Sequence, residues 1–307
     1  MRSDTASHRG IDAPPVDQGR DARLSIEEAR NDGDLVQLLI SRVPDANGNG
    51  NGNGKLGRRR QRRPKVTVVV PAVNEEANLP YVLPKIGEWI DEVILVDGRS
   101  TDRTLEVARK LLPDLRIVHQ NGYGKGDGLR AGFTAATGDI IIMLDADGST
   151  DPKEIPTFIG ALIAGAEFVK GTRFAQGAGT EDMTLLRRLG NKGLLLLVRV
   201  LYGGRFSDLC YGYIAFWKRV LPDIDPDSDG FAIETQMSVR ALKAKLKIAE
   251  VPSFERKRIH GKSNLRALPD GWMILKTILR ERFGRRRAPA KPLPVREPAP
   301  AARNWMS

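Results

Sequence analysis

Two carboxylates emerge from an apolar run in the middle of the chain. Asp145 and Asp147 follow residues 140–144, which read as a buried strand of isoleucine, methionine and leucine. Carboxylates one residue apart repel each other, so an apolar strand would not keep them without a cation or other donors. Mg²⁺ or Mn²⁺ held by one or two carboxylates plus substrate phosphates meets that need. The pair therefore predicts a divalent-cation site, and a solvated turn is the alternative, because Asp147-Gly148-Ser149 is also good turn chemistry.

A second carboxylate, Asp97, ends the apolar run at residues 92–96. At that position it is expected to accept hydrogen bonds from a nucleobase. Ser100 and Asp102 follow it and are typical of helix N-caps. We therefore predict ligand contact for Asp97 and capping for Asp102.

A glycine-rich turn surrounds Lys125, with glycines at positions 122, 124, 126 and 128. Such a turn brings backbone N–H groups and a cation to a helix N-terminus, where a phosphate is favoured. Its spacing fits neither a Walker A motif nor a dinucleotide fingerprint. A flexible strand-to-helix turn explains the same residues, and the turn alone does not decide between the two.

The elements that must position these groups alternate along the chain. Strands are predicted at 66–70, 92–96, 115–119, 139–144 and 167–170, and helices at 75–89, 101–112, 126–137 and 152–164. Alternation of this kind predicts an α/β domain over residues 65–265, with crossover connections and a mainly parallel sheet flanked by helices. Ligands of such sheets bind beyond the carboxyl ends of the strands, which is where Asp97, Asp145 and Asp147 fall.

Composition excludes several classes of protein. The 307 residues are 41% hydrophobic and 28% charged, which excludes a wholly disordered chain. A single cysteine, Cys210, excludes a disulfide framework and a cysteine-rich zinc site, and with three histidines any metal should be a hard cation. The sequence shows neither a spanning apolar segment nor a signal peptide, so we expect a cytoplasmic protein, with contact to the inner face of the cell membrane left open.

The two flanks carry most of the net charge of +11. Residues 1–64 are expected to be disordered apart from one short helix near 25–41. They include an Asn-Gly repeat at 47–54 and six basic residues within 55–63. Residues 285–307 form a second basic, Pro/Ala-rich tail that is expected to be disordered. These clusters suit an anionic membrane surface or a solvated linker equally, and nucleic acid is disfavoured because no aromatic residues interleave with the arginines.

Two amphipathic segments are predicted in the second half of the chain. The first runs from about residue 185 to 199 and carries leucines together with Arg187, Arg188, Lys192 and Arg199. This segment is either a helix that contacts a lipid phosphate at a membrane surface or a helix packed in the core with an exposed basic side. The second, at 266–284, has an apolar stripe beside a basic run and reads as a membrane-surface helix or as a docked C-terminal helix.

Seven ordered motifs within residues 66–265 resemble family 2 glycosyltransferases of the GT-A fold, in particular the polyprenyl-phosphate (dolichol-phosphate) hexosyltransferases. The motifs are Val68–Glu76, Val96–Asp102, Gly124–Gly132, Asp145–Asp147, Gly171–Phe174, Ser207–Phe216 and Arg258–Ser263. Order makes the set far more specific than any one motif. The chain departs from many relatives at Val73, Gly98, Tyr213, Ile214 and Asn264, which affects the expected sugar and acceptor more than the reaction type.

The resemblance implies transfer of a hexosyl group from a UDP- or GDP-hexose to an acceptor, with inversion, aided by Mg²⁺ or Mn²⁺. The implied acceptor is polyprenyl phosphate. It implies donor-binding residues Pro71, Asn74, Glu75, Asp97, Lys125, Asp145, Asp147 and Arg258, with Asp145 and Asp147 on the metal and Asp147 the more direct ligand. The implied acceptor-binding residues are Arg173, Arg187, Arg188, Lys262 and Ser263, and the implied catalytic residues are Asp208, Arg258 and Lys125.

The acceptor decides whether a base is needed. A hydroxyl must lose its proton to a positioned carboxylate, and Asp208 is the candidate, whereas a phosphate monoester is already anionic. A structural or helix-capping Asp208 fits the sequence equally well. Two alternatives stay open: a soluble glycosyltransferase that uses a hydroxyl acceptor in cell-wall or specialised metabolism, and a non-catalytic nucleotide-sugar-binding protein.

Overall fold

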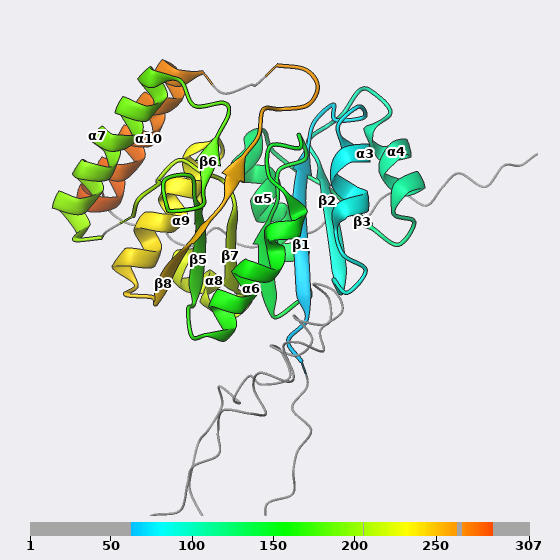
Figure 1. Ribbon diagram of the computed structural model, residues 1–307, viewed down its shortest axis with the longest axis horizontal. Helices are drawn as coiled ribbons and strands as arrows, with labels where there is room; N and C mark the ends of the chain where they lie inside the picture. Colours follow the sequence, from blue (N-terminus) through cyan, green and yellow to red (C-terminus); the bar gives the residue numbers. More distant parts are fainter. Residues whose placement is uncertain (1–62, 205, 263–265, 285–307) are drawn as a thin grey trace, which may run out of the picture.

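The chain folds around one mixed sheet covered by helices on both faces (Figure 1). A computed structural model describes residues 63–204, 206–262 and 266–284. The helix expected near 25–41 and the basic tail at 285–307 lie outside these residues. So does the basic cluster at 55–63 except for Arg63, which pairs with Asp91 at 2.8 Å.

Seven strands form the main sheet in the order β3-β2-β1-β4-β7-β5-β8. They are β1 (Val66–Ala72), β2 (Glu92–Asp97), β3 (Arg116–His119), β4 (Ile140–Met143), β5 (Phe168–Thr172), β7 (Ile214–Trp217) and β8 (Ile248–Pro252). β7 runs antiparallel to both of its neighbours, and every other pair is parallel. The mainly parallel α/β sheet is therefore confirmed. A separate pair, β6 (Gly179–Thr180) with β9 (Phe254–Glu255), lies beyond its carboxyl edge.

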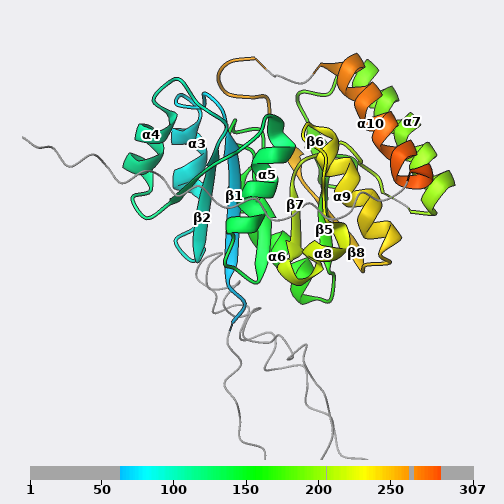
Figure 2. The ribbon, with the colours of Figure 1, turned by 180° about the vertical axis from the view of Figure 1, so that it is seen from behind.

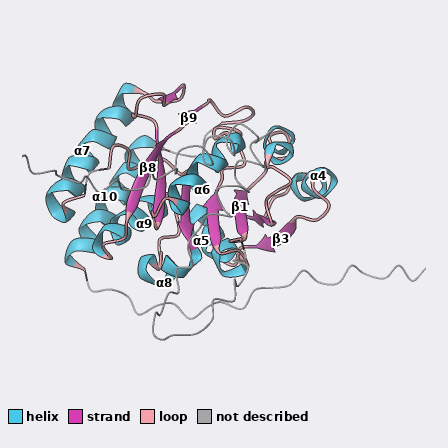
Figure 3. Cartoon of the chain, turned by 60° about the horizontal axis from the view of Figure 1, so that its bottom comes forward, coloured by secondary structure: helices cyan, strands magenta, loops and turns pink. Residues whose placement is uncertain are grey.

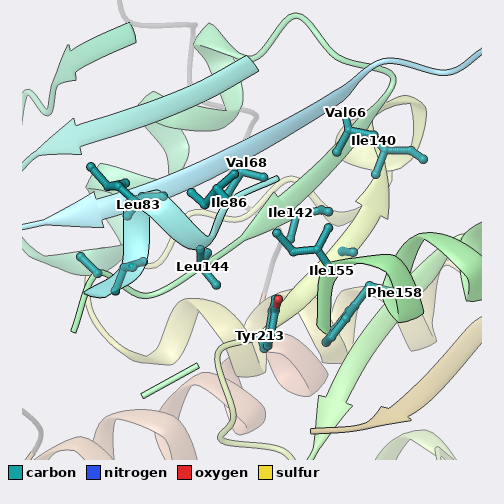
Figure 4. Close-up of a cluster of buried hydrophobic side chains, with 14 of the residues drawn as sticks. Val66, Val68, Leu83, Ile86, Ile140, Ile142, Leu144, Ile155, Phe158 and Tyr213 are labelled. Atoms are coloured by element: carbon teal, nitrogen blue, oxygen red, sulfur yellow. The ribbon is translucent and has the colours of Figure 1, made fainter. Parts of the chain in front are cut away.

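Helices close both faces of the sheet (Figures 2 and 3). One face is covered by α3 (Leu79–Val82), η1 (Leu83–Lys85), α4 (Thr104–Leu111), η2 (Pro152–Glu154) and α6 (Ile155–Ile163). The other is covered by α5 (Gly124–Ala135), η3 (Lys218–Val220), α8 (Leu221–Ile224) and α9 (Ala232–Lys243). On the first face Val68, Ile142, Phe158 and Tyr213 meet in a fully buried cluster, with the rings of Phe158 and Tyr213 stacked at 4.2 Å (Figure 4).

The long helix predicted over residues 75–89 is wrong. The structure has only the four-residue α3 and the single turn η1 in this segment. Pro80 and Pro84 explain the difference. Each ring removes a backbone donor and disfavours helical backbone at the preceding residue, so each begins a short helix and neither lies within a longer one.

Helices α7 (Leu185–Tyr202) and α10 (Ala267–Phe283) lie side by side at one end of the molecule (Figures 1 and 2). Their contact is apolar and includes Val198, Ile274 and Ile278. Tyr202 Oη adds a hydrogen bond to the carbonyl of Ile278 at 2.6 Å. Within the described part of the chain, neither of these helices nor any other is long and apolar enough to cross a membrane.

A buried ionic network fixes α10 onto α9. Glu281 on α10 accepts hydrogen bonds from Arg240 at 2.7 Å and Gln236 at 2.9 Å, and both charged side chains are almost fully buried. Burial alone would raise the pKa of Glu281, but the hydrogen bonds from Arg240 and Gln236 and the nearby cations lower it below its usual value of 4.5. The carboxylate form is thus favoured in the folded state.

Removing this carboxylate should loosen the C-terminal helix. Glu281→Ala leaves Arg240 buried with less compensation, so we expect a loss of about 3–5 kcal/mol in unfolding free energy. Because the folded pKa is depressed, the contribution of Glu281 is complete above about pH 4.5 and is lost as the pH falls further. Urea unfolding from pH 7 downwards tests this, with the exposed Glu106→Ala as control. Equal midpoints for wild type and Glu281→Ala at pH 7, or parallel acid profiles, would contradict it.

Candidate active site

The carboxyl ends of the strands converge on a cavity of about 600 Å³. Its polar side is formed by Lys125 at the start of α5, by Asp145 and Asp147 after β4, by Glu234 on α9 and by Arg258 after β9. Its apolar side is formed by α7 and α10. The cavity therefore combines the charged groups at the strand ends, Lys125, Asp145 and Asp147, with an apolar compartment formed by the two helices.

 

Lys125 forms ion pairs with two carboxylates that are distant in sequence. Its Nζ lies 2.6 Å from Asp145 Oδ1 and 2.6 Å from Glu234 Oε1. Burial alone would lower the pKa of Lys125, but Asp145 and Glu234 raise it overall, so the ammonium form persists. Burial raises the pKa of Asp145 to about 6, with Lys125 opposing the shift and Asp147 and Glu234 adding to it. The site therefore holds more negative charge than Lys125 alone can balance.

Arg258 bridges the other two carboxylates of the site. Its guanidinium lies 2.6 Å from Glu75 Oε2 and 3.4 Å from Asp147 Oδ2. Its Nε donates to the carbonyl of His260 at 2.6 Å. Arg258 thus links the turn after β1 to the turn after β4.

The segment that carries Arg258 is fastened to both turns by backbone hydrogen bonds. Arg256 N donates to Ser149 O at 2.8 Å, and His260 N donates to Asn78 Oδ1 at 2.8 Å. Gly148 has a φ of 79°, and a Cβ there would come within 2.5 Å of Ile259. The left-handed backbone favours glycine at this position, and a larger residue would also make the side chain of Ile259 move.

The charges of the site fit a divalent cation. Lys125 and Arg258 supply two positive charges, and the four carboxylates of Glu75, Asp145, Asp147 and Glu234 supply four negative ones when ionised. Among these six groups negative charge therefore exceeds positive charge, which favours binding of a divalent cation such as Mg²⁺ or Mn²⁺. Among the described residues no group of three or more His, Cys, Asp or Glu side chains could hold a metal by itself, so a bound ligand would have to complete the coordination.

Asp97 and Asn74 hold the turns beside this site together. Asp97 Oδ1 accepts from Ser100 N at 3.0 Å, its Oδ2 lies 3.1 Å from His119 Nδ1, and the residue is buried. Asn74 has a φ of 55°, and its Oδ1 accepts from Thr101 N at 2.8 Å. The structure thus gives both residues a positioning role, and their contact with a nucleoside stays a prediction. Pro71 lies within β1, opposite Val96 of β2.

Asp208 lies beneath the cavity in a buried ion pair. Its two oxygens accept from Arg173 Nε at 2.6 Å and Arg173 Nη2 at 2.9 Å, and the side chain has no exposed surface. Arg173 also pairs with Glu255 at 2.9 Å. With both oxygens engaged, Asp208 is not placed to take a proton from an acceptor hydroxyl. This geometry favours the structural interpretation of Asp208.

The other predicted acceptor residues are dispersed. Arg187 lines the cavity and pairs with Asp182 at 3.0 Å. Arg188 is exposed on α7, with its guanidinium 5.8 Å from the ring centre of Phe174. Lys262 is exposed and does not line the cavity. Ser263 lies outside the described residues.

Sequence reasoning missed Glu234, Glu255 and Asn191. Glu234 and Asn191 are buried and line the cavity together with Glu255. The local sequence gives little signal for Glu234, because Thr235 and Gln236 beside it are also polar. Asn191 stands between Gly190 and Lys192, where a polar residue gives no local signal either. Both are polar residues on otherwise buried helix faces, which calls for a partner or a ligand.

Comparison with known families defines the class of the protein. The helix-flanked sheet with acidic turns at its carboxyl edge is the GT-A fold. Residues 67–225 match the family described as Glycosyl transferase family 2. The chain belongs to glycosyltransferase family 2 and is an enzyme.

Curated relatives are similar over most of the domain. The chain is 33% identical to glycosyltransferase AglJ of Haloferax volcanii over 224 residues, which cover 70% of this chain and 71% of AglJ. It is 29% identical to a dolichol-phosphate mannosyltransferase of Pyrococcus furiosus, over 66% of this chain and 59% of the relative. It is 28% identical to the hexosyltransferase Agl6 of Haloferax volcanii, over 91% of this chain and 64% of the relative. The match thus spans less than two thirds of two of these proteins.

Solved structures share the fold. A mycobacterial protein superposes with a TM-score of 0.61 at 22% identity, over 71% of this chain and 75% of that one. Glucosyl-3-phosphoglycerate synthase of Mycobacterium tuberculosis, in complex with Mn²⁺, UDP-glucose and phosphoglyceric acid, superposes with a TM-score of 0.58 at 25% identity. That match covers 73% of this chain and 82% of the synthase.

Proposed function

We propose that the enzyme transfers a hexosyl group from a nucleoside diphosphate sugar to a phosphate oxygen of polyprenyl phosphate, with inversion at the sugar. The observation that carries the proposal is the cavity of about 600 Å³, which places the acidic site next to the apolar faces of α7 and α10. The names of two similar proteins support it, a dolichol-phosphate mannosyltransferase and a hexosyltransferase. A UDP-glucose complex with Mn²⁺ in a structural neighbour supports the donor class and the cation.

Donor binding is assigned to the acidic side of the cavity. Asp145 and Asp147 would hold Mg²⁺ or Mn²⁺, with Asp147 the more direct ligand. The cation would stabilise negative charge on the departing diphosphate. Lys125 and Arg258 flank these carboxylates and would hold the diphosphate oxygens in the same place. Glu75 and Asp97 lie at the turns where the nucleoside is expected.

A phosphate acceptor suits the residues on the other side of the cavity. Near neutral pH a phosphate monoester is already anionic, so it needs cations and hydrogen-bond donors more than it needs a base. Arg173 lines the cavity, while the only carboxylate predicted as a base, Asp208, is buried in its pair with Arg173. The acceptor oxygen would therefore attack without transferring a proton to the protein.

The outer surface of the two helices supports action at a membrane surface. Among the large apolar residues exposed on the two helices, four on each helix share a spacing of four, seven and four positions. They are Leu185, Leu189, Leu196 and Val200 on α7, and Leu268, Trp272, Leu279 and Phe283 on α10. This spacing keeps each set on one stripe of its helix, and such stripes with interspersed basic residues are typical of helices that lie on membranes. Peripheral attachment to the inner face of the cell membrane is part of the proposal.

A transfer assay tests this function. Purified protein is incubated with labelled UDP- and GDP-hexoses, Mg²⁺ or Mn²⁺, and polyprenyl phosphate in detergent. We expect label in the lipid phase with one donor, and loss of that label when EDTA removes the cation. Donor hydrolysis or transfer to a water-soluble hydroxyl, without lipid product, would reject the polyprenyl acceptor while leaving the family assignment intact.

A further inference from the structure

We infer that Gly190, Gly193 and Gly271 form the passage for the apolar chain of the acceptor, and that the amide of Asn191 contacts its phosphate head. This inference rests on the proposed function and adds the residues that select the acceptor. Gly190 and Gly193 lie on α7, Gly271 lies on α10, and all three line the cavity.

The three glycines differ from those that the fold needs for close packing. A Cβ added at Gly98 would lie 2.2 Å from the side chain of Val73, and one at Gly126 would lie 1.9 Å from the carbonyl of Ser228. A Cβ added at any of the three cavity glycines meets no described atom within 4 Å. Glycine inside a helix costs about 0.5–1 kcal/mol relative to alanine, so packing does not account for these positions. Their common effect is to keep side chains out of the space between α7 and α10.

The walls beside this opening are apolar. They include Leu186, Leu194 and Leu197 from α7 and Leu268, Trp272 and Leu275 from α10. Leu186, Leu268 and Trp272 are also among the exposed apolar residues of the two helices. The interior of the cavity is therefore continuous with the apolar outer surface, which suits entry of a hydrocarbon chain from a lipid surface.

Asn191 provides independent evidence for a ligand in this space. The residue is 3% exposed, lines the cavity and follows Gly190 directly. Its Oδ1 accepts from Leu209 N at 3.2 Å, but its Nδ2 is buried and has no hydrogen-bond partner among the described residues. An unsatisfied buried donor costs about 1–3 kcal/mol, and an acceptor oxygen from a ligand would remove that cost. A phosphate oxygen is such an acceptor, and Arg173, although it is paired with Asp208 and Glu255, lines the same cavity.

Size variants test the passage. Gly193→Leu and Gly271→Leu place a side chain in the open space, while Gly193→Ala and Gly271→Ala are the matched controls. We expect the leucine variants to lower kcat/KM for a long-chain polyprenyl phosphate about tenfold or more, with a smaller loss for geranyl phosphate. The alanine variants should stay near wild type, and all four should bind UDP or GDP with Mn²⁺ as wild type does in calorimetry.

Two substitutions of Asn191 separate ligand contact from a structural role. Asn191→Asp keeps an oxygen for Leu209 N but places a negative charge against the phosphate, whereas Asn191→Leu loses the oxygen. If Asn191 has only a structural role, Asn191→Asp should reduce both stability and activity less than Asn191→Leu does. Asn191→Asp also buries a carboxylate, so both variants should unfold at lower temperature than wild type. Ligand contact predicts that Asn191→Asp nevertheless unfolds at a higher temperature than Asn191→Leu and shows the larger rise in acceptor KM.

The outcomes distinguish the two levels of the proposal. The inference is wrong and the proposed function stands if the leucine variants transfer sugar to the lipid phosphate at the wild-type rate. The same conclusion follows if Asn191→Asp keeps the wild-type KM for the acceptor. If wild type transfers only to a water-soluble acceptor, both are wrong. Equal loss of donor binding in the leucine variants would also overturn the passage, because it would show a general disturbance of the site.

Discussion

Asp147→Asn is expected to reduce hexosyl transfer by about 10²–10³-fold, the range found when one preorganised electrostatic group is removed from an active site. The substitution removes the charge that faces Arg258 and the proposed cation. It keeps the Oδ1 atom that accepts from Ser149 N at 3.0 Å, so the turn after β4 should stay folded. Initial rates at saturating donor and cation measure the loss.

The control for this variant is Asp114→Asn. Asp114 is exposed and precedes β3, at the opposite edge of the sheet from the site. It should transfer sugar at the wild-type rate. Transfer by Asp147→Asn at a rate near that of Asp114→Asn, with both proteins folded, would show that the pair after β4 does not carry the reaction.

Asp208→Asn is expected to lower the free energy of unfolding by about 3–5 kcal/mol, because it breaks a buried ion pair and leaves Arg173 with Glu255 alone. Replacing both partners, as in Arg173→Met with Asp208→Leu, should recover part of that stability, since the fully buried pair is then removed as a whole and only the partly exposed Glu255 loses its contact. Urea unfolding of the single and double variants measures both effects.

The pH dependence of the remaining activity separates support from base catalysis. If Asp208 only positions Arg173, the folded fraction of Asp208→Asn keeps the wild-type pH–rate profile with polyprenyl phosphate. If Asp208 is instead the general base, the pH–rate profile of Asp208→Asn should lack the acidic limb that wild type shows. Unchanged stability combined with loss of that limb would restore the base interpretation of Asp208.

Much of the fold follows from local patterns in the chain. The β-branched and isoleucine runs of β1 and β4 form buried strands as expected, because strands covered on both faces need continuous apolar sequence. The segment after β1 could not be read from polarity alone, since Pro80 and Pro84 break its apparent helix. The antiparallel β7 was also not predicted, because strand direction depends on a long connection through α7 and not on the local sequence.

The candidate site was predictable where its residues end strands. Asp145, Asp147 and Lys125 are brought together as their positions in an α/β chain imply. Glu234 could not be assigned, because it reaches Lys125 from a helix far along the chain. The bidentate ion pair of Arg173 with Asp208 could not be predicted either, because the sequence shows two charged residues but not that they contact each other.

The most direct test of the account is the chemical structure of the product of the transfer assay. We predict that ³¹P and ¹H NMR of the lipid product will show a phosphodiester in place of the monoester, with the anomeric configuration of the sugar inverted relative to the donor. A product that retains the phosphate monoester and carries the sugar on a hydroxyl oxygen, or one with retained configuration, would contradict the proposed reaction.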